Sequence, residues 1–280
     1  MPKRVIFING KFAEAGEKEL QSLTPWNVGG RGVFETMAVY DGRVFAWPPH
    51  WIRMQRGLTL MGMTLPYSGR MIEKRMREVL RLNELKAARI RVMATIQDRR
   101  PCFNIVAQPS TRPAEAVYSQ GYALQVSSFM RQPGRYTHIK SIDYQMLYQA
   151  HETAKHQGFD EALLMNQSKE CVEAAYANLF IVKKETVMTP PVKSGCLNGI
   201  TRNVIEIFCR EEGIPLSIRA IPLAEAFKAE EMFITNSLLE VMPVTSLDGR
   251  KIGNGQPGAT TLFLAGMYRH LVKAFKRKGA

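Results

Sequence analysis

The 280-residue sequence lacks the features that mark several common protein classes. It has only four cysteines, none in a C-x-x-C pair, and no histidine cluster at metal-ligand spacing, so we expect no zinc or other metal site. No apolar run approaches the ~20 residues that a membrane-spanning helix requires, so no membrane association is expected. Because no signal-peptide pattern opens the chain, we expect reduced thiols and a cytoplasmic protein.

The sequence also lacks blocks of a single charge, although it is basic overall. Lysine and arginine number 38 against 25 acidic residues, a formal net charge of +13. The basic residues are scattered and are not interleaved with aromatic residues, so the pattern does not indicate nucleic-acid binding. A solvated basic surface is the simpler interpretation, and attraction of a small anionic substrate is the alternative.

The first part of the chain has the signals of a sheet with two helices. Asn9-Gly10 and Asp41-Gly42 each follow a β-rich run and are typical of two-residue hairpin turns. Apolar residues at helical spacing predict one helix that begins at Pro48 and ends before Thr64, and another over residues 71–85. Alternation predicts strands over residues 33–40, 89–96 and 102–107, with Arg91 pointing away from the aliphatic face.

Residues 108–113 contain two prolines and no periodicity, and they read as a linker between domains 1–112 and 113–280. The second domain is predicted to hold a strand over 122–129, helices over 141–157, 199–212, 224–229 and 259–276, and short strands over 161–166, 172–174, 179–183, 186–188, 231–235 and 239–243. The fold class is therefore α+β: a small N-terminal α/β sandwich, and a larger C-terminal domain of short strands packed with helices.

Seven separated segments form the most informative pattern in the sequence: residues 32–36, 50–53, 139–141, 158–164, 173–180, 196–202 and 235–238. In this order they resemble the fold-type-IV pyridoxal phosphate enzymes, the group that holds branched-chain and D-amino acid transaminases and aminodeoxychorismate lyase. Each segment alone is a weak signal, but seven in order across nearly the whole chain are specific. The resemblance implies pyridoxal 5′-phosphate as cofactor and a homodimer with its site between the two domains.

The resemblance assigns a lysine and a glutamate to the cofactor. Lys140 matches the lysine that binds the cofactor covalently, and it would shuttle a proton at the substrate carbon. Glu173, 33 positions later, matches the glutamate that bonds the pyridine nitrogen. A lone lysine is usually a surface charge, so the assignment of Lys140 rests on its place in the series of motifs. The apolar neighbours of Glu173 favour a functional carboxylate, because a buried carboxylate needs a partner.

Three further matches concern the cofactor's phosphate. Arg53 matches the phosphate arginine, a role that suits the bidentate guanidinium. Ile200 and Thr201 resemble the phosphate-binding turn, and because they open a predicted helix, free N–H groups and the helix dipole favour an anion there. Asn236 and Ser237 match the third phosphate contact, with an ordinary Asn-Ser turn as the alternative.

The substrate side is less regular. Thr36 and the segment 235–238 resemble the lyase more than the transaminases, and Arg91 falls where a basic residue faces the substrate, so it is the candidate for a substrate carboxylate. Gly29, Arg31 and Asp143 depart from the usual family residues on this side.

The leading hypothesis is therefore a 4-amino-4-deoxychorismate lyase that forms 4-aminobenzoate and pyruvate for folate synthesis. Lys140 would act as the base, and Thr36 would aid protonation of the leaving group. The alternative within the family is a class-IV aminotransferase acting on branched-chain or D-amino acids. A binding protein that has kept the fold and lost catalysis is a third interpretation.

Overall fold

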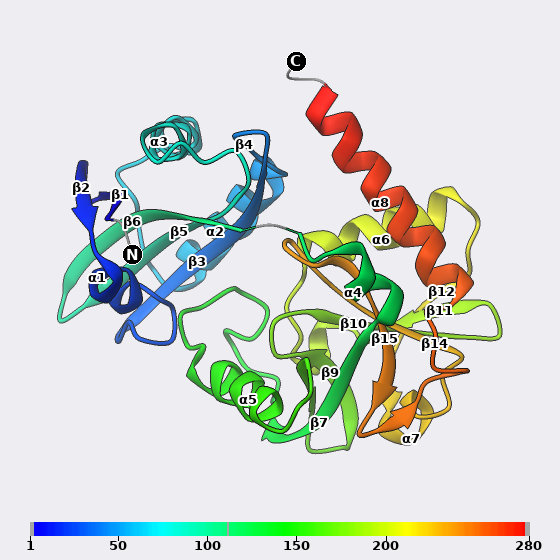
Figure 1. Cartoon of the computed structure of the whole chain (residues 1–280). Coiled ribbons are helices and arrows are strands. Elements are labelled where there is room, and N and C mark those ends of the chain that lie inside the picture. Colours follow the sequence, from blue (N-terminus) through cyan, green and yellow to red (C-terminus); the bar gives the residue numbers. More distant parts are fainter. Residues whose placement is uncertain (1–2, 111, 278–280) are drawn as a thin grey trace. The chain divides into compact units, whose positions relative to one another are not determined.

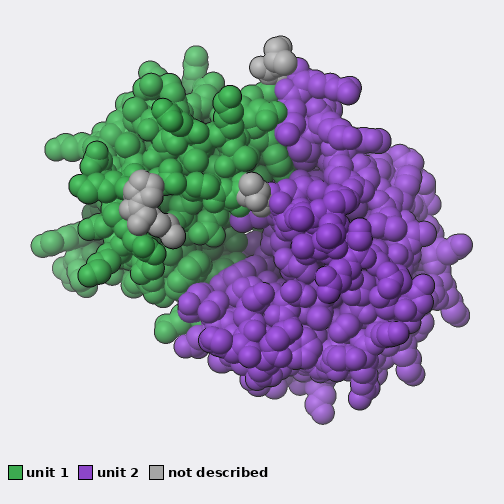
Figure 2. Space-filling model, viewed as in Figure 1, with its two compact units in different colours: residues 1–111, 139–145, 278–280 green, residues 112–138, 146–277 purple. Residues whose placement is uncertain are grey.

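The computed structural model describes residues 3–110 and 112–277, so residue 111 of the predicted linker lies outside the described residues (Figure 1). These residues form two compact units, which Figure 2 colours separately. Unit 1 comprises residues 3–110 and 139–145, and unit 2 comprises residues 112–138 and 146–277. Each unit contains its own sheet with helices, which confirms the α+β fold class. None of the helices within residues 3–110 and 112–277 is both long and apolar enough to cross a membrane.

Unit 1 is built on an antiparallel six-stranded sheet in the order β2-β1-β6-β5-β3-β4. Its strands are β1 (Arg4–Ile8), β2 (Lys11–Ala15), β3 (Arg31–Tyr40), β4 (Arg43–Val44), β5 (Ala88–Gln97) and β6 (Arg100–Pro109). Its helices are α1 (Glu17–Ser22), α2 (Trp47–Leu60) and α3 (Gly69–Leu82). The sequence analysis anticipated α2 and α3 but not the six-residue α1.

The tight turns of this sheet lie where the sequence placed them. Asn9 and Gly10 have φ angles of 46° and 90°, and Asp41 and Gly42 have 51° and 73°. Both pairs occupy the left-handed region, which matches the twist of two-residue hairpins and favours Asn, Asp and Gly. The two predicted hairpins are thus confirmed.

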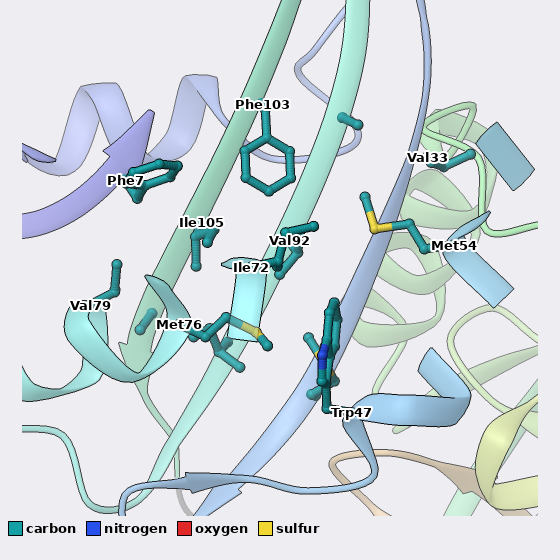
Figure 3. Close-up of a cluster of buried hydrophobic side chains, with 14 of the residues drawn as sticks. Phe7, Val33, Trp47, Met54, Ile72, Met76, Val79, Val92, Phe103 and Ile105 are labelled. Carbon is teal, nitrogen blue, oxygen red and sulfur yellow. The ribbon is translucent and has the colours of Figure 1, made fainter. Parts of the chain in front are cut away.

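One face of the unit 1 sheet, here called the helix face, is covered by α2 and α3. Val33, Val92 and Ile105 on neighbouring strands pack with Met54 of α2 and Met76 of α3 in a continuous apolar cluster (Figure 3). The close approach of α2 depends on Gly57, because a Cβ there would lie 2.8 Å from the Val33 side chain.

The opposite face, here called the loop face, carries the residues that alternate with those of the helix face. Phe34 and Met93 pack there with Ile142. Further along the sheet, Val106 packs with Leu20 of α1 in a separate small cluster. The loop face is therefore covered by one short helix and by irregular segments.

Unit 2 contains a ten-stranded sheet in the order β12-β11-β10-β14-β15-β7-β8-β9-β13, with β16 paired to β15. The strands are β7 (Tyr122–Met130), β8 (Glu161–Met165), β9 (Glu170–Ala174), β10 (Asn178–Lys183), β11 (Thr186–Thr189), β12 (Leu216–Ile218), β13 (Ile221–Pro222), β14 (Glu231–Asn236), β15 (Glu240–Leu247) and β16 (Arg250–Lys251). The helices are α4 (Glu115–Gln120), α5 (Gln145–His156), α6 (Ile200–Glu211), α7 (Leu223–Ala226), α8 (Ala259–Arg277) and the 3-10 helix η1 (Val192–Ser194).

The segment around Lys140 corrects one prediction. The helix predicted over residues 141–157 begins only at Gln145. The main chain before it pairs with β3 instead: Phe34 N–H donates to the Lys140 carbonyl, and Ile142 N–H donates to the Gly32 carbonyl. Residues 139–145 consequently belong to unit 1, although the sequence analysis assigned Lys140 to the second domain. The domain boundary at residue 112 stays a prediction.

Candidate active site

The amine of Lys140 lies against aromatic groups of unit 1. Its Nζ donates a hydrogen bond of 3.2 Å to the Tyr144 hydroxyl and lies 4.5 Å from the centre of the Phe34 ring. The rings of Phe34 and Tyr144 meet edge to face with centroids 5.0 Å apart. Because the main chain of residues 140–142 is also paired to β3, both the backbone and the side-chain amine of Lys140 are held in place.

A buried cluster of charged residues joins β3 to α2 on the helix face. Glu35 is fully buried, and its Oε1 accepts from Arg53 Nε at 2.8 Å. Its Oε2 accepts from Arg53 Nη2 at 2.6 Å and lies 2.6 Å from His50 Nδ1. The helical spacing of His50 and Arg53 directs both side chains to one carboxylate.

Burial and neighbouring charges shift the pKa values of Glu35 and His50 in this cluster. Burial alone would raise the pKa of Glu35, but the charge and hydrogen bonds of Arg53, followed by those of His50, lower it to about 2. Burial is also the largest influence on His50; it lowers the pKa below the ordinary value, and Glu35 only partly opposes it. The charges of Arg53 and Lys140 lower it further, so Lys140 lies within electrostatic range of this cluster.

On the loop face, Thr36 and Arg91 are direct cross-strand partners of β3 and β5. Arg91 Nη2 donates to the Leu23 carbonyl at 2.9 Å, while its buried Nε has no hydrogen-bond partner among the described residues. No carboxylate in residues 3–110 or 112–277 forms an ion pair with it. Burial, and then the charge of Arg89, lower the pKa of Arg91 to about 10. This guanidinium is therefore an uncompensated charge.

Asn104 is a second unsatisfied group on the loop face. It lies opposite Met93 on β5 and opposite Ile8 on β1, and it is fully buried. Neither its amide nitrogen nor its amide oxygen has a hydrogen-bond partner in the part of the chain that the structure describes. Such groups are rare in folded proteins, so this face differs from an ordinary packed core.

In unit 2, Glu173 lies on β9 and is 5% exposed. Its Oε2 accepts from the Leu197 N–H at 2.9 Å, and its Oε1 accepts from Arg131 Nε at 3.1 Å. The buried carboxylate predicted from its apolar neighbours is therefore present. Arg131 had no signal in the local sequence, because only the fold brings the end of β7 to β9.

The predicted phosphate turn is the N-terminus of α6. Gly199 precedes the helix without a side-chain cap, so the first N–H groups of α6 have no partner within the helix. A Cβ at Gly199 would collide with Asn178 Oδ1, which explains the glycine, while Asn178 Nδ2 donates to the Leu197 carbonyl at 2.8 Å. Thr201 is buried and its hydroxyl bonds Tyr268 of α8.

The turn at Asn236 and Ser237 follows β14. Asn236 Oδ1 accepts from the N–H groups of Leu238 and Leu239, and Asn236 Nδ2 donates to the Tyr176 carbonyl at 3.0 Å. The Asn236 side chain therefore shapes the turn, which corresponds to the alternative in the sequence analysis. A contact with phosphate at this turn remains a prediction for Ser237 and for the main chain.

The structure thus distributes the predicted site residues over both units. Unit 1 contains Lys140, Thr36, Arg53 and Arg91, and unit 2 contains Glu173, Ile200, Thr201, Asn236 and Ser237. The sequence analysis assigned no role to Glu35, Arg131 or Asn104. Residues of β3 alternate between the two faces of the sheet, and this alternation could have placed Glu35 beside buried Val33 and Met37. Asn104 gives no signal until the burial of β6 is known.

The donors of the two units suit a phosphorylated pyridine aldehyde. Lys140 supplies an amine, the uncapped start of α6 supplies N–H groups for a phosphate, and Glu173 supplies a buried carboxylate for a ring nitrogen. Lys140 and Glu173 are each held by hydrogen bonds within their own unit, and the chemistry of all three donor groups fits this cofactor.

Comparison with known proteins finds similar aminotransferases. A putative branched-chain-amino-acid aminotransferase of Methanocaldococcus jannaschii is 31% identical over 91% of this chain and 92% of its own length. The branched-chain-amino-acid aminotransferase of Pseudomonas aeruginosa is 32% identical over 96% and 92%. The D-alanine aminotransferase of Staphylococcus haemolyticus is 26% identical over 91% and 93%.

Solved structures show the same fold. The branched-chain aminotransferase of Thermoproteus uzoniensis with norvaline has a TM-score of 0.85 at 28% identity, covering 97% of this chain and 95% of that one. A T.th. branched-chain amino acid aminotransferase, complexed with N-(5′-phosphopyridoxyl)-L-glutamate, has a TM-score of 0.86 at 25% identity, covering 98% and 95%.

These relatives are aminotransferases, so the comparisons favour the alternative of the sequence analysis over the lyase. The cofactor is pyridoxal 5′-phosphate, as predicted. The family model for amino-transferase class IV matches residues 32–247, and the chain therefore belongs to the class-IV aminotransferases.

Proposed function

We propose that this protein is a branched-chain-amino-acid aminotransferase that uses 2-oxoglutarate as the amino acceptor. Relatives with that activity in their names share 31% and 32% identity with the chain over more than nine tenths of its length. The D-alanine aminotransferase is less similar, at 26%. Resemblance at Thr36 and at residues 235–238 supported the lyase, but it rests on two short segments.

The observation that carries the choice of acceptor is the uncompensated guanidinium of Arg91. Arg91 is half-buried and its Nε is buried without a partner among the described residues, which costs free energy that an anionic ligand offsets. Glutamate and 2-oxoglutarate have a second carboxylate, and a branched-chain substrate does not. A related branched-chain enzyme has been solved with a phosphopyridoxyl-glutamate adduct, so that protein accommodates a glutamate side chain.

The surroundings of Arg91 also suit an apolar substrate. Phe34 and Met93 lie next to Thr36 and Arg91 on their strands, two residues apart and on the same face. Val28 and Tyr144 pack against them. An apolar surface beside the guanidinium of Arg91 allows one site to accept first a hydrocarbon side chain and then a carboxylate.

Residues of this chain then have separate tasks. Bound to the protein, the cofactor supplies an electron sink. Lys140 Nζ moves a proton at the substrate carbon that carries the amino group, and the Tyr144 hydroxyl, 3.2 Å away, orients the amine. Arg53, locked by Glu35, and the start of α6 bind phosphate, while Glu173 bonds the ring nitrogen. As in the sequence analysis, we expect a homodimer.

The test is a comparison of three reactions with the purified holoenzyme. Leucine, isoleucine and valine with 2-oxoglutarate should give glutamate, D-alanine with 2-oxoglutarate should give much less product, and 4-amino-4-deoxychorismate should give no 4-aminobenzoate. Release of 4-aminobenzoate faster than glutamate formation would restore the lyase hypothesis. No reaction in any assay, together with no cofactor colour, would instead favour the binding protein.

A further inference from the structure

We propose that Arg131 is a positioning residue that orients Glu173 toward the ring nitrogen of the cofactor. The inference rests on the proposed role of Glu173 but not on the identity of the substrate. Arg131 immediately follows β7, and its side chain is 14% exposed beside a Glu173 side chain that is 6% exposed. Like Arg53 and Glu35, the two residues form a largely buried arginine–carboxylate pair.

The guanidinium of Arg131 connects three segments of unit 2. Its Nε lies 3.1 Å from Glu173 Oε1 and 3.2 Å from the Gly195 carbonyl, and its Nη2 donates to the Thr137 carbonyl at 3.2 Å. Gly195 belongs to the segment that leads to α6, and Thr137 to the segment that leads to Lys140. One planar group therefore connects the Glu173 carboxylate to the main chain at Gly195 and at Thr137.

The main chain of Arg131 is fixed as well. Its N–H donates to the Met165 carbonyl at 2.8 Å, at the end of β8. At the same place the pairing of β8 and β9 is irregular: Leu164 lies opposite Glu173, but Met165 lies opposite Cys171. Such a bulge re-aims the neighbouring side chain. Arg131 therefore binds β8 through its main chain, next to the irregular pairing with β9, and binds the Glu173 carboxylate of β9 through its side chain.

The two oxygens of Glu173 are bound by different kinds of donor. Leu197 N–H holds Oε2, and Arg131 holds Oε1. Without Arg131, Oε1 would lose its guanidinium donor, and the carboxylate plane could rotate more freely about its terminal bond, a broad torsion in glutamate. A lysine offers one point charge and could not reach the Glu173, Gly195 and Thr137 acceptors with one rigid plane. The geometry therefore requires arginine.

A structural role alone would be insensitive to the ring nitrogen, and this provides the test. The dissociation constants of pyridoxal 5′-phosphate and of its 1-deaza analogue, in which carbon replaces the ring nitrogen, are measured by titrating the cofactor-free protein. The variants are Arg131→Gln, Arg131→Lys, Glu173→Gln and the double variant Arg131→Gln with Glu173→Gln. Arg135→Gln is the matched control, since Arg135 is exposed in the same loop. The thermal midpoint of each cofactor-free variant is measured in parallel.

We expect Arg131→Gln to weaken binding of pyridoxal 5′-phosphate roughly tenfold or more, as for a lost charge-assisted hydrogen bond, and binding of the analogue by less than about threefold. In the Glu173→Gln background the same substitution should have little further effect, and Arg135→Gln should have none. Arg131→Lys should recover only part of the loss. If Arg131→Gln fails to fold, Arg131→Lys carries the comparison.

Two results would overturn the inference: equal losses for both cofactors, which would make Arg131 a residue of the fold alone, or unchanged binding of both. If Glu173→Gln itself fails to distinguish the two cofactors, the role of Glu173 is wrong and the inference falls with it. Because no amino acid is present in these titrations, failure of the branched-chain function would leave the result unaffected.

Discussion

The two faces of the unit 1 sheet solve the problem of buried polar groups in opposite ways. On the helix face, the buried carboxylate of Glu35 accepts three hydrogen bonds from Arg53 and His50 within the apolar cluster. On the loop face, among the described residues, Arg91 has no acidic partner and the side-chain amide of Asn104 has no hydrogen-bond partner. The same strands carry both faces, so the difference arises from what covers them.

This difference separates stability from substrate binding. A satisfied buried ion pair is costly to break, because removal of one partner leaves the other charge buried alone. An unsatisfied group already carries that cost, so its removal should stabilise the fold and impair only what the group binds. Substitutions on the helix face should therefore change the free energy of unfolding, and substitutions on the loop face should change substrate binding.

The largest effect is expected for Glu35→Gln on the helix face. It removes the charge shared by Arg53 and His50 and should lower the free energy of unfolding by about 3–5 kcal/mol. Chemical denaturation of the cofactor-free protein measures this loss. Glu14→Gln is the control, because Glu14 forms an exposed pair with Lys3 at 3.4 Å and should change stability by less than about 1 kcal/mol.

The same cluster predicts a dependence on pH. The pKa of Glu35 falls from 4.5 to about 2 on folding, so its stabilisation is complete above pH 4.5 and is lost as the pH falls toward 2. Folding also lowers the pKa of His50, which therefore opposes folding as the pH drops below 6.5. Unfolding curves between pH 4.5 and pH 3 should show wild type losing stability more steeply than Glu35→Gln. Parallel curves would refute the pairing.

Arg91→Met should have the next largest effect, and on binding rather than folding. It should raise the KM for 2-oxoglutarate by roughly 10–100-fold, the usual worth of a charge-assisted contact, and leave that for leucine nearly unchanged. The free energy of unfolding should stay equal or rise. Arg89→Met is the control, since Arg89 is an exposed arginine on the same strand and face as Arg91 and bonds Gln108 of β6. An equal rise in both KM values would exclude a specific carboxylate contact.

These faces also define what the sequence could predict. Periodicity placed α2, α3 and the hairpins, because each depends on local spacing or on a φ angle that few residues adopt. The helix expected to start at Ser141 failed because residues 140–142 pair with β3, a contact about 100 residues away in sequence. Arg131 was missed for the same reason. Lys140, Glu173 and the start of α6 were found through family motifs, and their roles remain proposals.

A smaller effect of opposite sign is expected for Asn104→Leu. Removal of two buried groups without partners should raise the free energy of unfolding by roughly 1–2 kcal/mol. Asn83→Leu is the matched control, because Asn83 makes three hydrogen bonds, two with Val5 and one with Val79, and should lose stability instead. If Asn104→Leu were also destabilising, the amide would have a partner such as a buried water, and the contrast between the faces would weaken.

The smallest effect is expected for Ser68→Ala, at the residue that precedes α3. The Ser68 hydroxyl accepts from the Met71 N–H at 3.2 Å and caps α3, and loss of such a cap costs about 1 kcal/mol. Since the buried side chains of α3, Ile72, Met76, Val79 and Leu80, are all apolar, the thermal midpoint should fall while the KM values for leucine and 2-oxoglutarate stay unchanged. Ser68→Asp, which keeps an acceptor, should restore the midpoint. A change in either KM would mean that the helix face also shapes the substrate site, and the separation of stability from substrate binding would fail.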